Sequence, residues 1–142
     1  MESITIRRLK ISDKPICNKI FNLNCIYEKW EISEWKKLSA ALDNIDNFFV
    51  AIMNRELVGF SGYDKLNIND AYYGLFWCQV HPDFRNKGVG RLLTERRISA
   101  IKEDRNAEAI ISSTNRPWHL ERFGFISVSE INEYNLMILK LK

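Results

Sequence analysis

Apolar residues recur at two different spacings along the chain, and the change in spacing separates strands from helices. Two isoleucines alternate with polar neighbours near the N-terminus, which predicts a strand over residues 3–9. A spacing of three to four residues then places Ile16, Ile20 and Leu23 on one stripe of a helix. A second helical pattern covers about residues 33–42. The first third of the chain is therefore expected to form one strand and two helices.

The rest of the chain alternates between apolar strands and one long helix. In order, the pattern predicts strands over 48–53 and 57–63, a long strand over 73–80, a helix over 88–104, a strand over 107–113, a short helix near Pro117, and a closing hairpin over 125–129 and 134–141. No linker, repeat or low-complexity tract interrupts this order. We therefore predict a single domain over residues 1–142 with mixed α/β structure.

Composition narrows the classes of protein that this chain can belong to. A hydrophobic content of 46% predicts a packed globular core. The net charge of +3 suits an anionic ligand but falls short of the basic face typical of nucleic-acid-binding proteins. Three cysteines without a Cys-x-x-Cys pair indicate neither a disulfide framework nor a metal site. Since no run of residues suits a membrane span or signal peptide, we expect a cytoplasmic protein with no membrane or nucleic-acid partner.

The most informative segment joins the long strand to the long helix. It reads His-Pro-Asp-Phe-Arg-Asn-Lys-Gly-Val-Gly-Arg. Gly88 and Gly90 carry no Cβ, so backbone N–H groups at the start of the helix stay accessible, and the helix dipole favours an anion there. Arg85, Lys87 and Arg91 add positive charge around the same point. The segment therefore predicts a site for a phosphate or pyrophosphate group.

Spacing excludes two familiar glycine-rich loops. A dinucleotide-binding fingerprint needs a third glycine where Leu93 stands, and in a Walker loop a lysine directly follows a glycine. The remaining pattern, Arg-x-x-Gly-x-Gly after a strand that ends in Val-x-Pro, resembles the acetyl-CoA-binding motif of the GCN5-related N-acetyltransferases, the GNAT family. The order of elements that follows, up to the pair Gly124 and Phe125, is similar to the second CoA-binding element of this family.

This resemblance implies both a fold and an activity. The implied fold is α/β, with a mixed, mostly antiparallel six- to seven-stranded sheet flanked by helices and splayed central strands. The implied enzyme is an N-acetyltransferase that passes acetyl from acetyl-CoA directly to a primary amine of a small molecule, of amino acid, polyamine or amino-sugar type, or of a protein. The implied cofactor-binding residues are Cys78, Gln79, Val80, Arg85, Asn86, Lys87, Gly88, Val89, Gly90, Arg91 and Asn115.

The usual proton donor of the family is missing from this chain. Many members carry a tyrosine four residues before the glycine of the Gly-Phe pair, and here Leu120 stands at that position. The neighbouring His119 titrates near neutrality and is our candidate catalytic residue, with a partly exposed structural histidine as the alternative. The long strand holds no acid, so the general base stays open. We expect Cys78 to be a small core residue rather than a nucleophile, and His81 to be structural.

Aromatic and acidic residues cluster after the first predicted helix, where family members often build one wall of the acceptor pocket. Tyr27, Glu28 and Trp30, together with Tyr73 of the long strand, are the candidate substrate-binding residues, because carboxylates and aromatic faces attract a cationic amine. The alternative is a helix whose tryptophans pack on the sheet and whose glutamates face water. With the tyrosine and the acid missing, a catalytically weak CoA-binding sensor or interaction module is the alternative function. Formation of a homodimer stays open.

Overall fold

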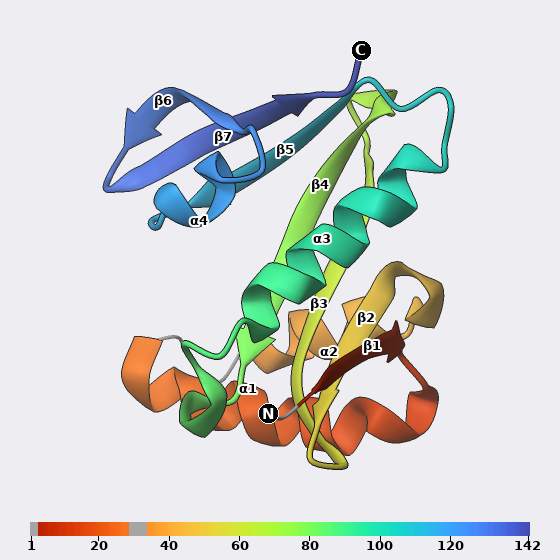
Figure 1. The fold of residues 1–142 in the computed structure, drawn as a ribbon, viewed down its shortest axis with the longest axis vertical. Coiled ribbons are helices and arrows are strands. Elements are labelled where there is room, and N and C mark those ends of the chain that lie inside the picture. The colour runs from red at the N-terminus through yellow and green to blue at the C-terminus, as the bar shows by residue number, and fades with distance from the viewer. Residues whose placement is uncertain (1–2, 29–33) are drawn as a thin grey trace. The chain divides into compact units, whose positions relative to one another are not determined.

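The computed structural model describes residues 3–28 and 34–142 (Figure 1). Within these ranges seven strands form a mixed sheet in the order β1-β2-β3-β4-β5-β7-β6. The strands are β1 (Ile4–Arg8), β2 (Phe48–Met53), β3 (Glu56–Leu66), β4 (Asn69–Val80), β5 (Ala109–Thr114), β6 (Ile126–Ile131) and β7 (Tyr134–Lys140). β4 pairs with β5 in parallel, whereas β1 with β2, β2 with β3, β5 with β7 and β6 with β7 are antiparallel. The prediction of a mixed, mostly antiparallel sheet is confirmed.

The helices follow the predicted order. They are α1 (Lys14–Glu28), α2 (Glu34–Leu42), α3 (Val89–Lys102) and α4 (Trp118–Glu121), with the short 3-10 turns η1 (Ile11–Asp13), η2 (Ile45–Asn47) and η3 (Pro82–Phe84). β3 and β4 are longer than predicted, so that only residues 67–68 separate them. None of the helices in the described ranges is long and apolar enough to cross a membrane.

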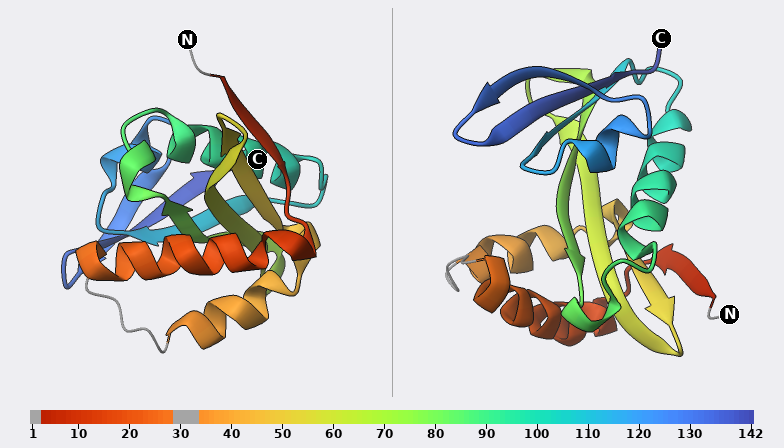
Figure 2. Two further views of the ribbon diagram at one scale, coloured as in Figure 1. Left: turned by 90° about the horizontal axis from the view of Figure 1, so that it is seen from below. Right: turned by 60° about the vertical axis from the view of Figure 1, so that its left-hand side comes forward.

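The chain forms two compact units, and each has a hydrophobic core of its own. The first unit comprises Met1–Gly62 and Trp77–Arg97, and the second comprises Tyr63–Phe76 and Ile98–Lys142. β3, β4 and α3 therefore contribute residues to both units. In the first unit, α1 and α2 cover one face of the strands and α3 covers the other (Figure 2).

The first core corrects the predicted orientation of α1. Ile16 is 43% exposed, whereas Cys17, Ile20 and Phe21 are buried against α2, β2 and β3. The buried positions are spaced as on one face of a helix, but this face is turned by about 100°, one residue, from the predicted stripe. The reason is the size of Phe21, whose ring contributes more apolar surface to the core than Ile16 would.

The second core lies on one face of β4, β5 and β7. Ile98 and Ile101 of α3 and Leu120 of α4 pack there with Ile110 and Met137. Figure 1 shows α4 on the same side of the β5–β7–β6 sheet. The opposite face of these three strands carries no helix of the second unit.

In the first unit, β3 approaches α3 closely because residue 59 has no side chain. A Cβ atom at Gly59 would lie 2.9 Å from Cγ1 of Val89 and 3.1 Å from the carbonyl oxygen of Gln79. Distances this short force the neighbours to move. Glycine at this position therefore sets the distance between the sheet and the start of α3.

Replacing Gly59 by alanine is expected to lower the free energy of unfolding by about 1–3 kcal/mol, because overpacking forces side chains and backbone to shift. Urea and thermal unfolding measure this change. Gly90→Ala is the matched control, since the nearest atom to a Cβ there lies 4.0 Å away and helices favour alanine. Equal stability of the two variants would contradict the close approach of β3 to α3.

Candidate functional site

Strand β4 changes its backbone conformation near its end. Trp77 has a φ of 57°, in the left-handed region that aromatic residues rarely occupy. Before this residue, Tyr72–Gly74 of β4 pair with Ala109–Ile111 of β5. Trp77 itself packs against the first core. Of the two residues that follow it, Cys78 is exposed and Gln79 is buried. The prediction that Cys78 is a core residue is therefore wrong, because its neighbour Gln79 takes the inward position.

The loop between β4 and α3 begins with a structural histidine, as predicted. The N–H of His81 donates to the carbonyl of Val58 over 2.7 Å. Its Nδ1 accepts a hydrogen bond from the N–H of Asp83 over 3.1 Å, which caps η3. Its ring packs edge-on against Phe84, with the ring centroids 5.4 Å apart. These contacts fix the point where the chain leaves the sheet.

The next residues form a concave turn of the backbone. Asn86 and Gly88 have φ values of 62° and 89°, and Lys87 between them does not share this left-handed conformation. Such alternation turns successive N–H groups toward one side, an arrangement known as a nest that binds anions. A side chain at residue 88 would be strained, which explains the glycine there.

Helix α3 begins directly at this turn. Its first hydrogen bond joins the N–H of Leu92 to the carbonyl of Gly88 over 3.1 Å. The N–H groups of Val89, Gly90 and Arg91 come before that bond, so they have no intrahelical partner. The first turn contains no acidic residue that would compete for the positive end of the helix dipole. The nest and the helix start therefore present donors from adjacent residues.

Gly90 has no structural reason to be glycine. It lies inside α3 with an ordinary helical φ, and a Cβ there would meet nothing closer than Cγ2 of Val80 at 4.0 Å. Glycine inside a helix costs about 1 kcal/mol relative to alanine. The chain thus keeps open, at a cost in stability, the space beside the first N–H groups of the helix. That space fits a group that must come close to the backbone.

The three predicted cationic residues of the loop differ in their surroundings. Lys87 and Arg91 are exposed, and the Nη2 of Arg91 lies 3.9 Å from where a Cβ of Gly88 would be. Arg85 is half-buried, and its Nη2 donates to Oδ1 of Asn24 over 2.6 Å. Arg85 is therefore also a structural residue that ties the loop to α1.

Asn24 is a residue of the site that the sequence analysis missed. It is only 1% exposed, and its Nδ2 donates to Oε1 of Gln79 over 3.0 Å and to the carbonyl of Val80 over 3.1 Å. Because a carbonyl only accepts and a guanidinium only donates, the amide can have only this orientation. One buried side chain of α1 thus holds both the end of β4 and Arg85. Its position seven residues after Cys17, on the same face of the helix, could have indicated that Asn24 is buried.

Arg97 anchors α3 farther along the helix and was also missed. It is 3% exposed, and burial lowers its pKa from the ordinary value. Its Nη1 donates to the carbonyl of Gly62 over 3.1 Å and its Nη2 to the hydroxyl of Thr94 over 3.0 Å. The preceding Arg96, whose role the sequence left open, stacks its guanidinium 4.7 Å from the ring centroid of Phe49. Neither arginine belongs to the start of the helix.

Asn115 and His119 lie in the second unit, where both are exposed. The short helix α4 starts after Pro117 without a side-chain cap, and the Thr114 hydroxyl accepts from the N–H of Arg116 over 3.0 Å. Asn115 therefore does not cap α4, so the alternative of a simple helix cap is wrong. Asn115 stays a predicted ligand residue.

The environment of His119 favours its neutral form. Desolvation lowers the pKa of His119, and the positive charges of Arg116 and Arg122 lower it further. A neutral imidazole accepts a proton more readily than it donates one near neutral pH. Leu120 is 8% exposed and belongs to the second core. If His119 takes part in chemistry, this environment suits a general base.

The predicted acceptor residues are described only in part. The hydroxyl of Tyr73 donates to Oδ2 of Asp104 over 2.6 Å, and burial, with that bond, raises the pKa of Tyr73. This bond occupies the phenol inside the second unit, so the hydroxyl of Tyr73 already has a partner there. Trp30 lies outside the described residues, as do the side chains of Tyr27 and Glu28 at the end of α1.

Comparisons with known proteins identify the family and the fold of this chain. Residues 44–127 match the family model described as an acetyltransferase (GNAT) domain. The comparison with curated proteins finds no match. A GNAT-family acetyltransferase from Staphylococcus aureus Mu50 is 20% identical with a TM-score of 0.81, over 99% of this chain and 100% of that chain. These values establish a shared fold.

Two further solved structures contain bound ligands. A GNAT acetyltransferase from Brucella melitensis, in complex with acetyl-CoA, is 16% identical with a TM-score of 0.79, over 99% of this chain and 89% of that chain. N-acetylglutamate synthase from Neisseria gonorrhoeae, complexed with coenzyme A and N-acetyl-glutamate, is 16% identical with a TM-score of 0.76. That match covers 99% of this chain and 35% of the synthase.

Replacing Asn24 by leucine is expected to lower the free energy of unfolding by at least about 2 kcal/mol, because Gln79 and the carbonyl of Val80 would lose their buried donor. Urea unfolding measures the change. Asn22→Leu is the matched control, since Asn22 is exposed on the same helix. Equal effects of the two substitutions would show that the buried amide does not hold β4 to α1.

Proposed function

The chain belongs to the GNAT acetyltransferase family, and on this basis we propose that it transfers acetyl from acetyl-CoA directly to a primary amine. The observation that carries the proposal is the open space at Gly90, beside N–H groups at the start of α3. Protein packing does not explain this glycine, whereas a pyrophosphate close to the backbone would.

The residues of the first unit would bind the CoA moiety. The N–H groups of Gly88, Val89, Gly90 and Arg91 would donate to the pyrophosphate, as donors at helix starts and in nests do. Lys87, Arg91 and the guanidinium of Arg85 would add positive charge, with Arg85 held in position by Asn24. The backbone of Cys78, Gln79 and Val80 would line the pantetheine arm. The Brucella and Neisseria proteins of similar fold were solved with acetyl-CoA and with coenzyme A, which supports CoA as the ligand.

Acetyl-CoA, when bound, supplies the acetyl thioester, and the chain must position the amine and move protons. An amine attacks only in its neutral form, so a nearby base accelerates transfer. His119 is the candidate, since its lowered pKa keeps the imidazole neutral and ready to accept a proton near neutral pH. Asn115, at the end of β5, would hold the pantetheine end or the acceptor.

The proposed acceptor class rests on the sequence at the end of α1 and just after it. Glu28 stands between Tyr27 and Trp30 in the sequence, and a carboxylate together with aromatic rings would suit a cationic amine. An amino acid, a polyamine, an amino sugar or a lysine of a protein would satisfy this chemistry. The direct test is a panel of these amines with acetyl-CoA, in which release of free CoA thiol is measured.

Gly90→Val is expected to weaken CoA binding at least tenfold, because the added methyl groups fill the space beside the helix N–H groups (a loss of roughly 1.4 kcal/mol or more). Calorimetry with CoA measures the affinity, and the melting temperature serves as the folding control. Ser99→Val, an exposed position on the same helix, is the matched variant and should bind CoA normally.

Two outcomes would contradict the proposed function. Wild-type protein that fails to bind CoA at millimolar concentration, or Gly90→Val with unchanged affinity, would remove the site from the start of α3. Wild-type protein that binds CoA but releases no thiol with any amine would be the sensor or interaction module instead.

His119→Gln is expected to reduce kcat by about 100-fold or more at unchanged CoA affinity if His119 is the base. Because its pKa is lowered, wild-type kcat should rise with pH through a value below 6.5, where imidazolium loses its proton. The variant should lack this rise. A variant with the activity and pH profile of the wild type would exclude His119 from catalysis.

A further inference from the structure

Arg97 is a buried cation that lies outside the site at the start of α3. It is 3% exposed, and its guanidinium donates three hydrogen bonds. Nε donates to the carbonyl of Leu93 over 3.4 Å, Nη1 to the carbonyl of Gly62, and Nη2 to the hydroxyl of Thr94. All three acceptors are neutral, so these bonds leave the positive charge itself unbalanced.

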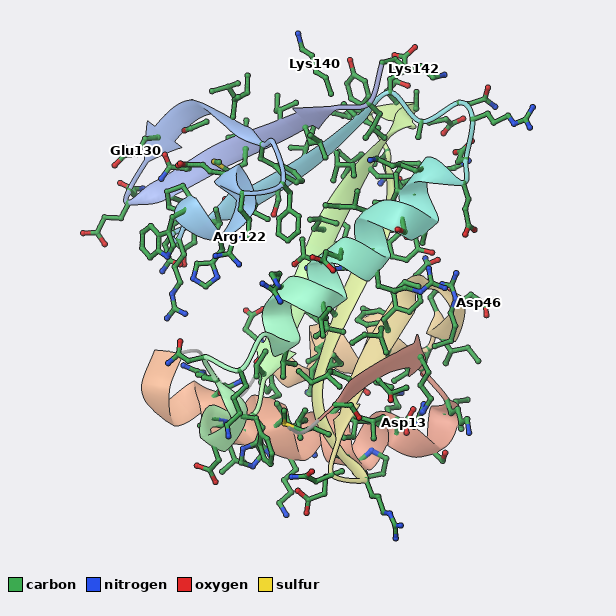
Figure 3. The ribbon with its side chains drawn as sticks, viewed as in Figure 1. Asp13, Asp46, Arg122, Glu130, Lys140 and Lys142 are labelled. Atoms are coloured by element: carbon green, nitrogen blue, oxygen red, sulfur yellow. The ribbon has the colours of Figure 1, made fainter. Side chains whose placement is uncertain are left out.

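No carboxylate pairs with Arg97 among the side chains that the structure describes. The ion pairs printed for the described part of the first unit lie elsewhere and join Arg7 to Asp13, Lys14 to Asp43, and Lys37 to Glu34. Figure 3 shows Asp13 beside α1 and Asp46 near β2. A buried charge without a counter-charge destabilises a fold, because no attraction offsets the loss of hydration. Bracing the carbonyl of Gly62 does not require this charge, since a neutral amide donor would serve.

The side chain of Cys78 lies on the same face of the sheet as Arg97. Gln79 accepts a hydrogen bond from α1, and side chains alternate along a strand, so the residues on either side of Gln79 point toward α3. In agreement, Cγ2 of Val80 lies 4.0 Å from where a Cβ of Gly90 would be. Burial lowers the pKa of Arg97, and interaction with Cys78 opposes this effect. The charge of Arg97 therefore acts at the end of β4.

Protein rather than water separates this charge from the surface at Cys78. Cys78 is exposed, whereas Arg97 is enclosed between α3 and β3 by its hydrogen bonds. A charge acts more strongly through protein than through water, because the protein is less polarisable. Residues 72–80 of β4 include no acid that would cancel it. The exposed end of β4 therefore faces a fixed positive charge.

We propose that Arg97 is a positioning residue whose charge, without touching the substrate, stabilises the CoA thiolate that leaves during acetyl transfer. The proposal rests on the proposed function, because it requires the pantetheine arm to run along the backbone of Cys78, Gln79 and Val80. It supplies a role that the chain otherwise lacks, since Leu120 stands where a proton-donating tyrosine is usual in the family.

The negative charge that Arg97 would stabilise develops on sulfur. The amine nitrogen forms a bond to the thioester carbonyl carbon, and the carbon–sulfur bond breaks with its electron pair remaining on sulfur. The amine proton passes to the base or to water, and the thiolate takes a proton from water afterwards. A fixed cation near the sulfur favours this step because it needs no rearrangement when the charge appears.

Ultraviolet titration of the thiol of bound CoA tests the proposal on the full chain, because a thiolate absorbs where a thiol does not. Dethio-CoA, which lacks the sulfur, gives the blank for the tyrosines and cysteines of the protein. In the wild type, the bound thiol should ionise at a lower pH than the thiol of free CoA. In Arg97→Gln, which keeps a donor for Gly62 but removes the charge, it should ionise about one pH unit or more above the wild type, a tenfold change in the equilibrium.

Two further variants separate charge from structure. Arg97→Lys keeps the charge and should titrate close to the wild type. Arg96→Gln is the matched control, since it removes a charge one residue away that stacks on Phe49, and it should also titrate like the wild type. Melting curves and calorimetry with CoA check that each variant folds and binds. With an amine that the wild type accepts, Arg97→Gln should lower kcat at least about tenfold at unchanged KM for acetyl-CoA.

The possible failures are distinguishable. Wild-type protein that does not bind CoA would overturn the proposed function and this proposal together. Bound CoA that ionises at the same pH as free CoA, or at a higher one, would overturn the role of Arg97 alone, even if Arg97→Gln does not fold. Equal titration of wild type and Arg97→Gln, or an equal shift in Arg96→Gln, would do the same.

Discussion

The buried amide of Asn24 is the interaction on which the shape of the candidate site depends. It accepts from Arg85 and donates to Gln79 and to the carbonyl of Val80, so α1, the end of β4 and the loop meet at one side chain. Buried polar groups are stable only when each has its partner, and here the partners belong to the end of β4 and to the loop before α3, which are proposed to bind CoA. The loop is therefore fixed by a network beneath it rather than by its own residues alone.

The two glycines of the loop serve different physical purposes. Gly88 permits a backbone conformation that places N–H groups on one side of the turn. Gly90 has no such conformational role, because its backbone is helical and a Cβ atom there would lie 4.0 Å from the nearest atom. Glycine at residue 88 thus allows a left-handed backbone, whereas glycine at residue 90 leaves the N–H groups of the helix accessible. This difference lets substitution of Gly90 test binding without disturbing the fold.

Local patterns were sufficient to predict the order of elements and the family. The bounds of β2, α3 and β5 fall within two residues of those predicted from periodicity. The predicted phosphate site rests on glycines and charges a few residues apart and stays a prediction. The sequence did not reveal Asn24 or Arg97, because the partners of Asn24, and the Gly62 carbonyl that Arg97 reaches, lie 35 to 61 residues away in the chain. Nor did it reveal that Ile16 is exposed, since Cys17 and Phe21 form the preferred face of α1 only when the sheet is present.

The left-handed backbone at Trp77 limits which insertions and deletions β4 can tolerate. In β4, Tyr73 and Leu75 belong to the second core, whereas Trp77 packs against the first core and the buried Gln79 accepts a hydrogen bond from Asn24. Side chains alternate between the two faces of a strand, so the number of residues on either side of Trp77 determines which side chains of β4 point inward. Deletion of one residue near Trp77 would turn the inward-facing side chains between that point and the end of β4 outward, and the outward-facing ones inward. Natural length variation should therefore collect in the hairpin turns and be absent from this short stretch.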